Sequence, residues 1–232
     1  MSLQLAAAVV ATAIMLRSID VRPWSDVAMH RGALRPRVVL EGWLLGGGAI
    51  ALACGLLLLA RWLRIVPAPD GSSLAAALSL TVFLLVAALG EEVISRGYLL
   101  TTLSDGLGAR AAIGITSFLF ALAHLRNAGV SVQSFLIVAL AGVFLGAVRM
   151  MYRSVYASTA AHAAWNWVLA VAFHASVSGI QFQAPDYRMV EQGPDWITGG
   201  QWGPEGGLAA ALGMLGALAY LYRTRLLRRE EP

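Results

Sequence analysis

The stretch LLVAALGEEVISRGYLL, residues 84–100, decides the fold, because it places charges inside an apolar segment. It carries two adjacent glutamates, Glu91 and Glu92, and an arginine, Arg96, with apolar residues on both sides. A charged side chain near the centre of a membrane-spanning helix costs about 2.5–3.5 kcal/mol on insertion scales. Three such side chains in one segment therefore need partners, a function, or both.

The composition of the whole chain is typical of polytopic membrane proteins. Of its 232 residues, 58% are hydrophobic and only 13% are charged, and the mean hydropathy is +0.69. Unbroken apolar runs predict an all-α, polytopic transmembrane helix bundle of about seven spans, because the strands of a membrane barrel would be short and alternating. The apolar segments lie at about residues 2–16, 39–60, 74–100, 109–125, 132–150, 155–177 and 207–222.

The basic residues predict the topology of this bundle. All seventeen are arginine, and alternate connections assign thirteen to one side of the membrane and four to the other. The positive-inside bias predicts a cytoplasmic C-terminus and an N-terminus outside, in a membrane that we expect to be the bacterial inner membrane. We interpret the net charge of +4 as a topology signal and expect the lipid bilayer, and no nucleic acid, as a partner. The single cysteine, Cys54, excludes a disulfide within the chain.

Two of the three charged residues in 84–100 can form an ion pair, and the third cannot. On a helix, Glu92 and Arg96 are four residues apart on one face, in the favourable order for an ion pair. Glu91 points about 100° away and has only Ser95 at the same spacing. A buried carboxylate without a cation can act as a base or an acid near neutral pH. The alternative is that the helix ends at Gly90 and that both acids lie in water.

Two further apolar segments carry polar groups at helical spacing. In HAAWN, residues 162–166, His162 and Asn166 are four residues apart and can direct two donors towards one oxyanion. In FALAH, residues 120–124, the ring of Phe120 can pack against His124 and orient it.

Intramembrane ionisable groups mostly face the bundle interior and one another, so we expect these three segments to share one site. The alternative is that each histidine is a buried structural residue. His174 and His30 have no partner at a useful spacing, and we assign them no role.

Three motifs, in order over about residues 75–177, resemble those of the CPBP intramembrane proteases. EEVISR is similar to EExxxR, FALAH to FxxxH and HAAWN to HxxxN. The family includes the CaaX prenyl endopeptidases of the Rce1 type and bacterial bacteriocin-immunity and abortive-infection proteins. The resemblance implies an eight-helix bundle whose site opens to the cytosol. Because the sequence shows seven segments, we expect the N-terminal helix to be short or missing.

The resemblance also implies roles for the motif residues. Glu91 would be the general base that activates water, and His124 would assist it. His162 and Asn166 would form the oxyanion hole. The remaining motif positions are filled by Glu92 and Arg96.

Metal dependence stays open between two types of protease. If Zn²⁺ is present, Glu91, His124 and His162 would hold it and leave one position for water. The sequence contains no HExxH pair, and we expect Glu92 to form an ion pair with Arg96 rather than to bind a metal. We therefore favour a glutamic-type enzyme with no cofactor over a metalloendopeptidase.

These observations predict an intramembrane endopeptidase that cleaves a membrane-associated protein or peptide. The substrate is either prenylated, as in a CaaX protein, or unprenylated. The alternative is a non-catalytic transporter, scaffold or immunity protein that uses the same polar cavity. We expect an N-terminal transmembrane region at 1–73, a catalytic core at 74–178, and an extracytoplasmic loop, last helix and basic cytoplasmic tail at 179–232. We interpret the loop at 179–206 as a connector rather than a lid.

Overall fold

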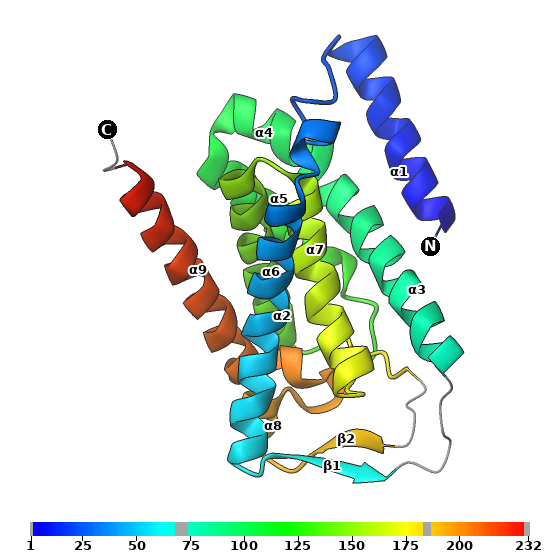
Figure 1. Ribbon diagram of the computed structural model, residues 1–232, viewed down its shortest axis with the longest axis vertical. Coiled ribbons are helices and arrows are strands. Elements are labelled where there is room, and N and C mark those ends of the chain that lie inside the picture. The colour runs from blue at the N-terminus through cyan, green and yellow to red at the C-terminus, as the bar shows by residue number, and fades with distance from the viewer. Residues whose placement is uncertain (1, 68–73, 183–186, 230–232) are drawn as a thin grey trace.

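The computed structural model describes residues 2–67, 74–182 and 187–229, and it forms a bundle of helices (Figure 1). Each predicted apolar segment coincides with a helix, as expected. The α-helices are α1 Ser2–Ile14, α2 Pro36–Leu59, α3 Leu74–Glu92, α4 Leu99–Leu107, α5 Ala109–Ala123, α6 Val132–Tyr152, α7 Val155–Trp167, α8 Asp195–Thr198 and α9 Leu208–Arg229. The π-helical segments are η1 Met15–Ile19, η3 Val93–Tyr98 and η4 Val168–Ala172. The 3-10 turns are η2 Arg31–Ala33, η5 Gly200–Trp202 and η6 Pro204–Gly206.

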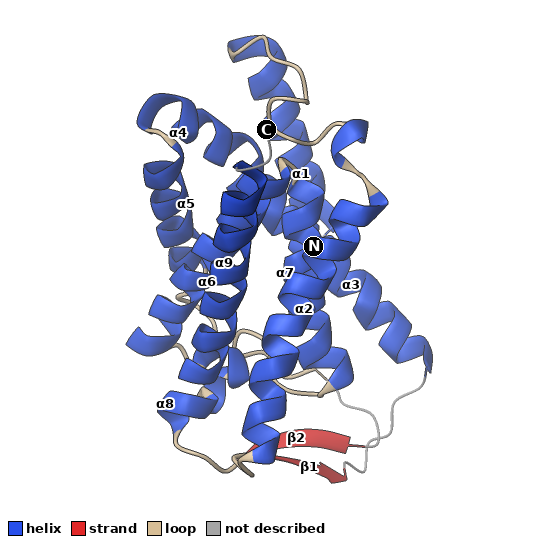
Figure 2. Cartoon of the chain, turned by 60° about the vertical axis from the view of Figure 1, so that its left-hand side comes forward, coloured by secondary structure: helices blue, strands red, loops and turns tan. Residues whose placement is uncertain are grey.

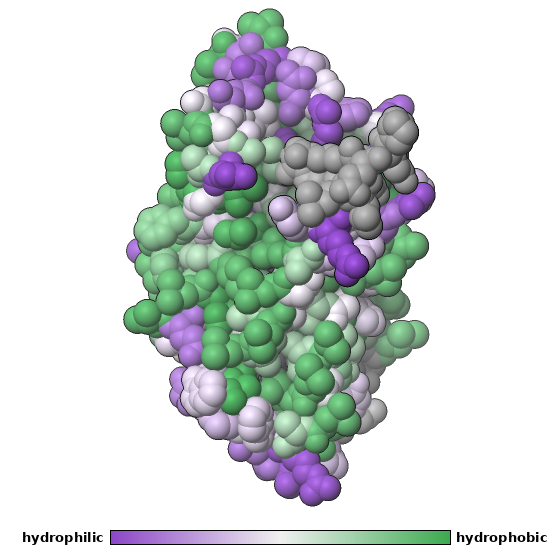
Figure 3. Space-filling model, turned by 90° about the vertical axis from the view of Figure 1, so that its left-hand side faces the viewer, coloured by the Kyte–Doolittle hydropathy of each residue, from purple (hydrophilic) through white to green (hydrophobic). Residues whose placement is uncertain are grey.

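The surface of the bundle fits a bilayer. In Figure 3 a hydrophobic band separates hydrophilic side chains at the two ends. Among the described residues, three helices are long and apolar enough to cross a membrane, namely Pro36–Leu59, Leu74–Leu107 and Val132–Tyr152. Shorter apolar helices lie at Leu3–Ile19, Ala109–Ala123 and Leu208–Thr224. The chain is thus an integral membrane protein with a helical bundle, and the number of about seven spans stays a prediction.

Helix α7 lies at the centre of the bundle and contacts α2, α3 and α6. Its approach to α2 depends on glycine, because a Cβ at Gly46 would lie 1.9 Å from the carbonyl oxygen of Ala161. Close helix packing at small residues is the usual arrangement in membranes. By contrast, a Cβ at Gly48, two residues later, would meet nothing within 4 Å. Gly48 lies on the opposite side of the helix from this contact.

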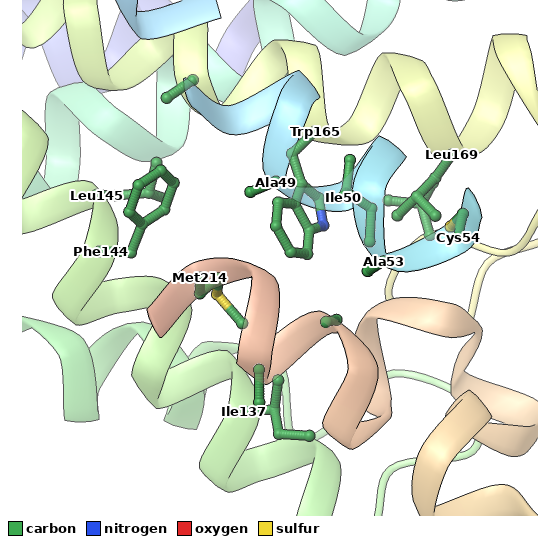
Figure 4. Close-up of a cluster of buried hydrophobic side chains, with 14 of the residues drawn as sticks. Ala49, Ile50, Ala53, Cys54, Ile137, Phe144, Leu145, Trp165, Leu169 and Met214 are labelled. Carbon is green, nitrogen blue, oxygen red and sulfur yellow. The ribbon is translucent and has the colours of Figure 1, made fainter. Parts of the chain in front are cut away.

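An apolar core fills the space between α2, α6, α7 and α9 (Figure 4). Ile50 of α2 and Trp165 of α7 face Met214 of α9 in this cluster, and Phe144 of α6 lies beside them. Cys54 is buried in the same cluster. This core fixes the position of α7, which carries one of the predicted motifs.

The two ends of the bundle differ in composition. At one end, the segment between α1 and α2 contacts the connection between α6 and α7, where Ser154 Oγ donates to the carbonyl of Ala33 at 2.8 Å. Arg22 of the same segment pairs with Asp105 of α4. The C-terminal end of α9 lies at this end too, at the top of Figure 1. We call this the arginine-rich end.

At the other end of the bundle, a two-stranded sheet covers the helices (Figure 2). Strand β1, Leu63–Pro67, pairs antiparallel with β2, Tyr187–Glu191, with Leu63 opposite Glu191. The sequence predicted only loops there. The sheet joins the connection after α2 to the loop before α9, so the region at 179–206 is partly structured. Residue 73, where the first predicted region ends, and residues 183–186 of the loop lie outside the described residues.

Candidate active site

The helix that carries the EEVISR motif is interrupted. After Glu92 the chain forms the π-helical segment η3, in which Gly97 has non-helical dihedrals of φ −80° and ψ −112°. The predicted segment at 74–100 is therefore helical but has a kink at Gly97. A π-helical turn shifts the register of the side chains and releases a carbonyl, and it often marks a functional site. Here the carbonyl of Arg96 accepts a hydrogen bond from Nε of Arg149 at 3.1 Å.

The predicted ion pair between Glu92 and Arg96 is confirmed. Nη1 of Arg96 lies 3.0 Å from Oε1 of Glu92, and both side chains are fully buried. Nη2 of the same guanidinium donates to the carbonyl of Gly142 on α6 at 3.1 Å. A buried pair is tolerated only when further hydrogen bonds satisfy its atoms. The alternative, in which both acids lie in water, is wrong for Glu92.

Phe120 of α5 joins this pair to the second motif. The guanidinium of Arg96 lies 4.4 Å from the centroid of the Phe120 ring, which is a cation–π distance. The other contact of the ring is with His124, at a centroid distance of 4.6 Å. The prediction that Phe120 packs against His124 is therefore confirmed. One aromatic ring thus fixes an arginine and an imidazole from different helices.

His124 ends α5, and its orientation is set by the backbone. Its Nδ1 lies 2.7 Å from the carbonyl oxygen of Phe120. Because a carbonyl only accepts, Nδ1 of His124 carries the proton, and Nε2 of the neutral ring is an acceptor. This Nε2 lies 4.0 Å from Oε2 of Glu91.

His162 of α7 approaches the same carboxylate from the other side. Its Nδ1 lies 3.2 Å from Oε1 of Glu92, and its Nε2 lies 3.9 Å from Oε2 of Glu91. With Nδ1 donating to Glu92, Nε2 of the neutral ring is again an acceptor. The structure thus brings the three predicted motifs together, as expected.

The chemical consequence is a convergence of acceptors. Oε2 of Glu91 and the two Nε2 atoms of His124 and His162 face one point, and Oε2 has no hydrogen-bond partner among the described residues. Buried polar atoms are rarely left unsatisfied. The arrangement calls for a species that satisfies acceptors, such as a water molecule, which donates to two of the three atoms at a time, or a cation, which binds all three. The side chain of Glu91 is 29% exposed, so that species can exchange with solvent or substrate.

Two cavities meet at this cluster. The larger, about 380 Å³, is a groove between α3, α5 and α7, closed at one end by residues 177–182. The smaller, about 40 Å³, extends from the cluster into the core beside Trp165. His124, His162 and Asn166 line both cavities. The amide of Asn166 has no hydrogen-bond partner in the part of the chain that the structure describes, so it can donate to a bound group.

The sequence did not predict Glu205 as part of this region. Its carboxylate lines the smaller cavity and accepts hydrogen bonds from Nε1 of Trp165 at 2.7 Å and from Oγ of Ser178 at 2.9 Å. Glu205 thus fastens the 179–206 loop beside the site, and the interpretation of this loop as a connector stays a prediction. An acid between Pro204 and two glycines was the available signal, but its distance from the motifs in the sequence concealed it.

His174 and His30 lie away from the cluster. The ring of His174 makes an edge-to-face contact with Tyr187 of β2, with ring centroids 4.4 Å apart. His30 lines a different cavity at the arginine-rich end.

The same three acceptor atoms, one carboxylate oxygen and two imidazole nitrogens, are of the types that bind zinc. A tetrahedral zinc with bonds of about 2.05 Å separates its ligands by about 3.3 Å. A water with hydrogen bonds of about 2.8 Å separates its partners by about 4.6 Å. The observed separations of 3.9 and 4.0 Å lie between these values, so either occupant requires a small shift of the side chains. As they stand, no three His, Cys, Asp or Glu side chains of the described residues are grouped closely enough to hold a metal ion.

Comparison with known proteins agrees with the geometry. The family model described as type II CAAX prenyl endopeptidase Rce1-like matches residues 73–168, a segment that contains all three motifs. No curated protein and no solved structure matches the chain. Residues 73–168 are therefore similar to the Rce1-like family of CAAX prenyl endopeptidases, which is a family of proteases.

Proposed function

We propose that this protein hydrolyses a peptide bond in a membrane-associated protein or peptide, with Glu91, His124 and His162 around the reacting water. The observation that carries the proposal is the convergence of three acceptor atoms on one point next to a groove. A water molecule fits there because it can donate to the carboxylate and to an imidazole together. Similarity to a protease family supports the same reaction.

The chemistry begins with Glu91 as the general base. Its carboxylate takes a proton from the water while the water oxygen attacks the carbonyl carbon of the scissile peptide. The protonated Glu91 then gives that proton to the amide nitrogen as the carbon–nitrogen bond breaks. The products are a carboxylate and an amine, and Glu91 returns to its starting state. His124, held by the carbonyl of Phe120, orients the water through its Nε2.

The oxyanion of the tetrahedral intermediate needs donors on the opposite side of the water. The free amide of Asn166 supplies one N–H in this proposal. His162 supplies a second only when its Nε2 also carries a proton, and the oxyanion then provides the counter-charge of the imidazolium. Glu92, neutralised by Arg96, orients His162 rather than reacting.

The groove suits a substrate that arrives from the bilayer. Its walls are mainly apolar and include Phe83 and Leu84 of α3, Leu119 of α5 and Phe182 of the loop. An extended peptide with an apolar segment or a lipid anchor can lie against such walls, because both remove apolar surface from water. We propose a substrate of this kind, with a prenylated C-terminus as one member of the class.

Zinc is the alternative occupant of the convergence point. Glu91 with the Nε2 atoms of His124 and His162 would hold it, and the Nδ1 atoms are already held by Phe120 and Glu92 as the second shell of a zinc site requires. Bound zinc would make its water more acidic and polarise the substrate carbonyl. We favour the metal-free mechanism, because Glu91 is placed to take the proton of the water without help.

The decisive experiment compares the purified full chain with Glu91→Gln and His124→Ala. Each protein is reconstituted in lipid nanodiscs with membrane-anchored peptides, prenylated and unprenylated, and the products are identified by mass spectrometry. We expect both substitutions to reduce kcat by at least about a hundredfold. Asp195→Asn, an equivalent carboxylate-to-amide change at an exposed position, should retain full activity.

Retention of wild-type kcat in Glu91→Gln would sink the proposed role of this carboxylate. The metal question has a separate readout. Chelator-resistant turnover by protein that contains no zinc supports the glutamic mechanism. Stoichiometric zinc that is lost together with activity, and restores activity when added back, overturns it.

A further inference from the structure

A third cavity, larger than the groove, lies at the arginine-rich end. It measures about 1070 Å³ and lies between the segment before α2, the start of α2, α4 and the end of α6. It shares no lining residue with the two cavities of the active site. Of the described residues that line it, five are arginines and three are carboxylates. The arginines are Arg22, Arg35, Arg37, Arg149 and Arg153.

Two of these arginines are already neutralised. Arg22 pairs with Asp105, and Arg37 pairs with Glu41 at 2.8 Å. The other three, Arg35, Arg149 and Arg153, form no ion pair with any described residue. The cavity therefore presents an excess of positive charge that the described residues do not neutralise.

Arg149 is the most informative of the three, because its side chain is buried. Only 7% of the residue is exposed. Its hydrogen bonds go to neutral atoms, from Nε to the carbonyl of Arg96 at 3.1 Å and from Nη2 to Oγ1 of Thr101 at 2.7 Å. An arginine that only sets membrane topology can stay in water, whereas a buried cation without a counter-charge costs free energy. An anion in the cavity would remove that cost.

Exposed aliphatic residues adjoin the lining residues of the cavity in the sequence. Val21 is 83% exposed, Leu34 54% and Leu40 57%, and each is adjacent in sequence to a residue that lines the cavity. Exposed aliphatic side chains beside a cluster of guanidinium groups suit a ligand with a charged head and an acyl chain. A small soluble anion would make no use of the aliphatic side chains.

We propose that this cavity binds the phosphate-bearing headgroup of an anionic membrane lipid, with Arg35, Arg149 and Arg153 as its charged contacts. The planar guanidinium offers paired donors that match two phosphate oxygens. Basic pockets between membrane helices bind such headgroups elsewhere. The proposal is independent of the peptidase assignment.

The test measures lipid binding directly by native mass spectrometry of the detergent-solubilised full chain. Phosphatidylglycerol and phosphatidylcholine are titrated separately, and their dissociation constants are compared. The test variant is the double substitution Arg35→Gln with Arg153→Gln, because both side chains are exposed and folding should survive. The matched control is Arg17→Gln with Arg110→Gln, which removes the same charge from exposed positions outside the cavity.

We expect phosphatidylglycerol to bind more tightly than phosphatidylcholine, and the test variant to weaken its binding by at least about tenfold. The control should change the constant by less than about twofold. Equal losses in the two variants, or no preference between the lipids, would overturn the proposal. Inorganic phosphate or glycerol 3-phosphate serves as competitor. If either displaces the lipid at comparable concentration, the ligand is a soluble phosphate and the lipid assignment is wrong.

Discussion

The Nδ1 atom of His162 lies 3.2 Å from Oε1 of Glu92, and this contact joins α7 to α3 inside the bundle. The same oxygen accepts from Arg96 at 3.0 Å. One fully buried carboxylate therefore orients an imidazole and neutralises a guanidinium. Glu91, its neighbour in sequence, keeps an oxygen without a partner among the described residues. The two glutamates of the motif thus have different environments, and different functions follow.

Substitution of Arg96 should unfold the protein far more readily than substitution of an exposed arginine. Arg96→Met leaves the Glu92 carboxylate buried without its cation, which should lower the free energy of unfolding by about 3–5 kcal/mol. Arg37→Met is the control, because Arg37 forms an exposed pair at the same spacing with Glu41, and its loss should leave the free energy of unfolding nearly unchanged. Denaturant unfolding in detergent measures both. Equal costs would show that the buried pair does not hold the site together.

Phe120 should matter for catalysis beyond its contribution to packing. Phe120→Leu removes the ring that contacts both Arg96 and His124, so the imidazole loses its alignment with Glu91. We expect kcat to fall by about ten- to a hundredfold, since small misplacements of a catalytic group have effects of this size.

Phe118→Leu is the control for this substitution. Phe118 is 53% exposed, and its described ring partner is Phe135, away from the cluster. Its kcat should stay within about twofold of wild type, because no catalytic side chain depends on it. Equal losses of kcat at the two positions would contradict a positioning role for Phe120.

The spacing of residues in the sequence predicted the contacts that depend on helical periodicity. Glu92 with Arg96, and Phe120 with His124, are neighbours four residues apart, and a helix brings such pairs together without help from the rest of the chain. The meeting of the three motifs was predicted from the tendency of intramembrane polar groups to face one another.

Other features depend on contacts that no local pattern encodes. The π-helical turn at Gly97 forms where Arg149, more than fifty residues later, binds the carbonyl of Arg96. The sheet needs β1 and β2 to meet across most of the chain, and neither strand is apolar enough to stand out. Glu205 reaches Trp165 and Ser178 only because the loop folds back. Such tertiary contacts override local propensity.

The sheet at the far end of the bundle should weaken as the pH rises. Burial raises the pKa of Glu191 to about 7, against an ordinary value of 4.5. The folded state therefore holds a proton that the unfolded state releases between these two values. The stability from protonated Glu191 is complete below about pH 4.5 and is lost as the pH rises through about 7.

Hydrogen exchange of the β1 and β2 amides measures this effect. Protection should be greater at pH 5 than at pH 8 after correction for the intrinsic exchange rate, because these pH values lie on either side of the folded-state pKa of about 7. Glu191→Gln, which keeps the shape without the charge, should abolish the difference. Asp195→Asn should preserve it, because Asp195 acts on Glu191 only from a distance. An unchanged difference in Glu191→Gln would assign the pH dependence to another group.

The contact between α2 and α7 should tolerate no side chain at Gly46. A Cβ there would lie 1.9 Å from the carbonyl oxygen of Ala161, and both atoms belong to rigid helical backbone. His162 follows Ala161 directly on α7. Separation of α2 from α7 would therefore also move the imidazole of His162 away from Glu92. Gly46→Ala should therefore lower the free energy of unfolding by more than about 3 kcal/mol and remove most of the activity.

Gly48→Ala is the control. A Cβ there meets nothing within 4 Å, so this substitution should be neutral or stabilising by about 0.5–1 kcal/mol. Thermal unfolding and turnover of the two variants in nanodiscs test this directly, and equal behaviour would show that the helices can separate here without consequence.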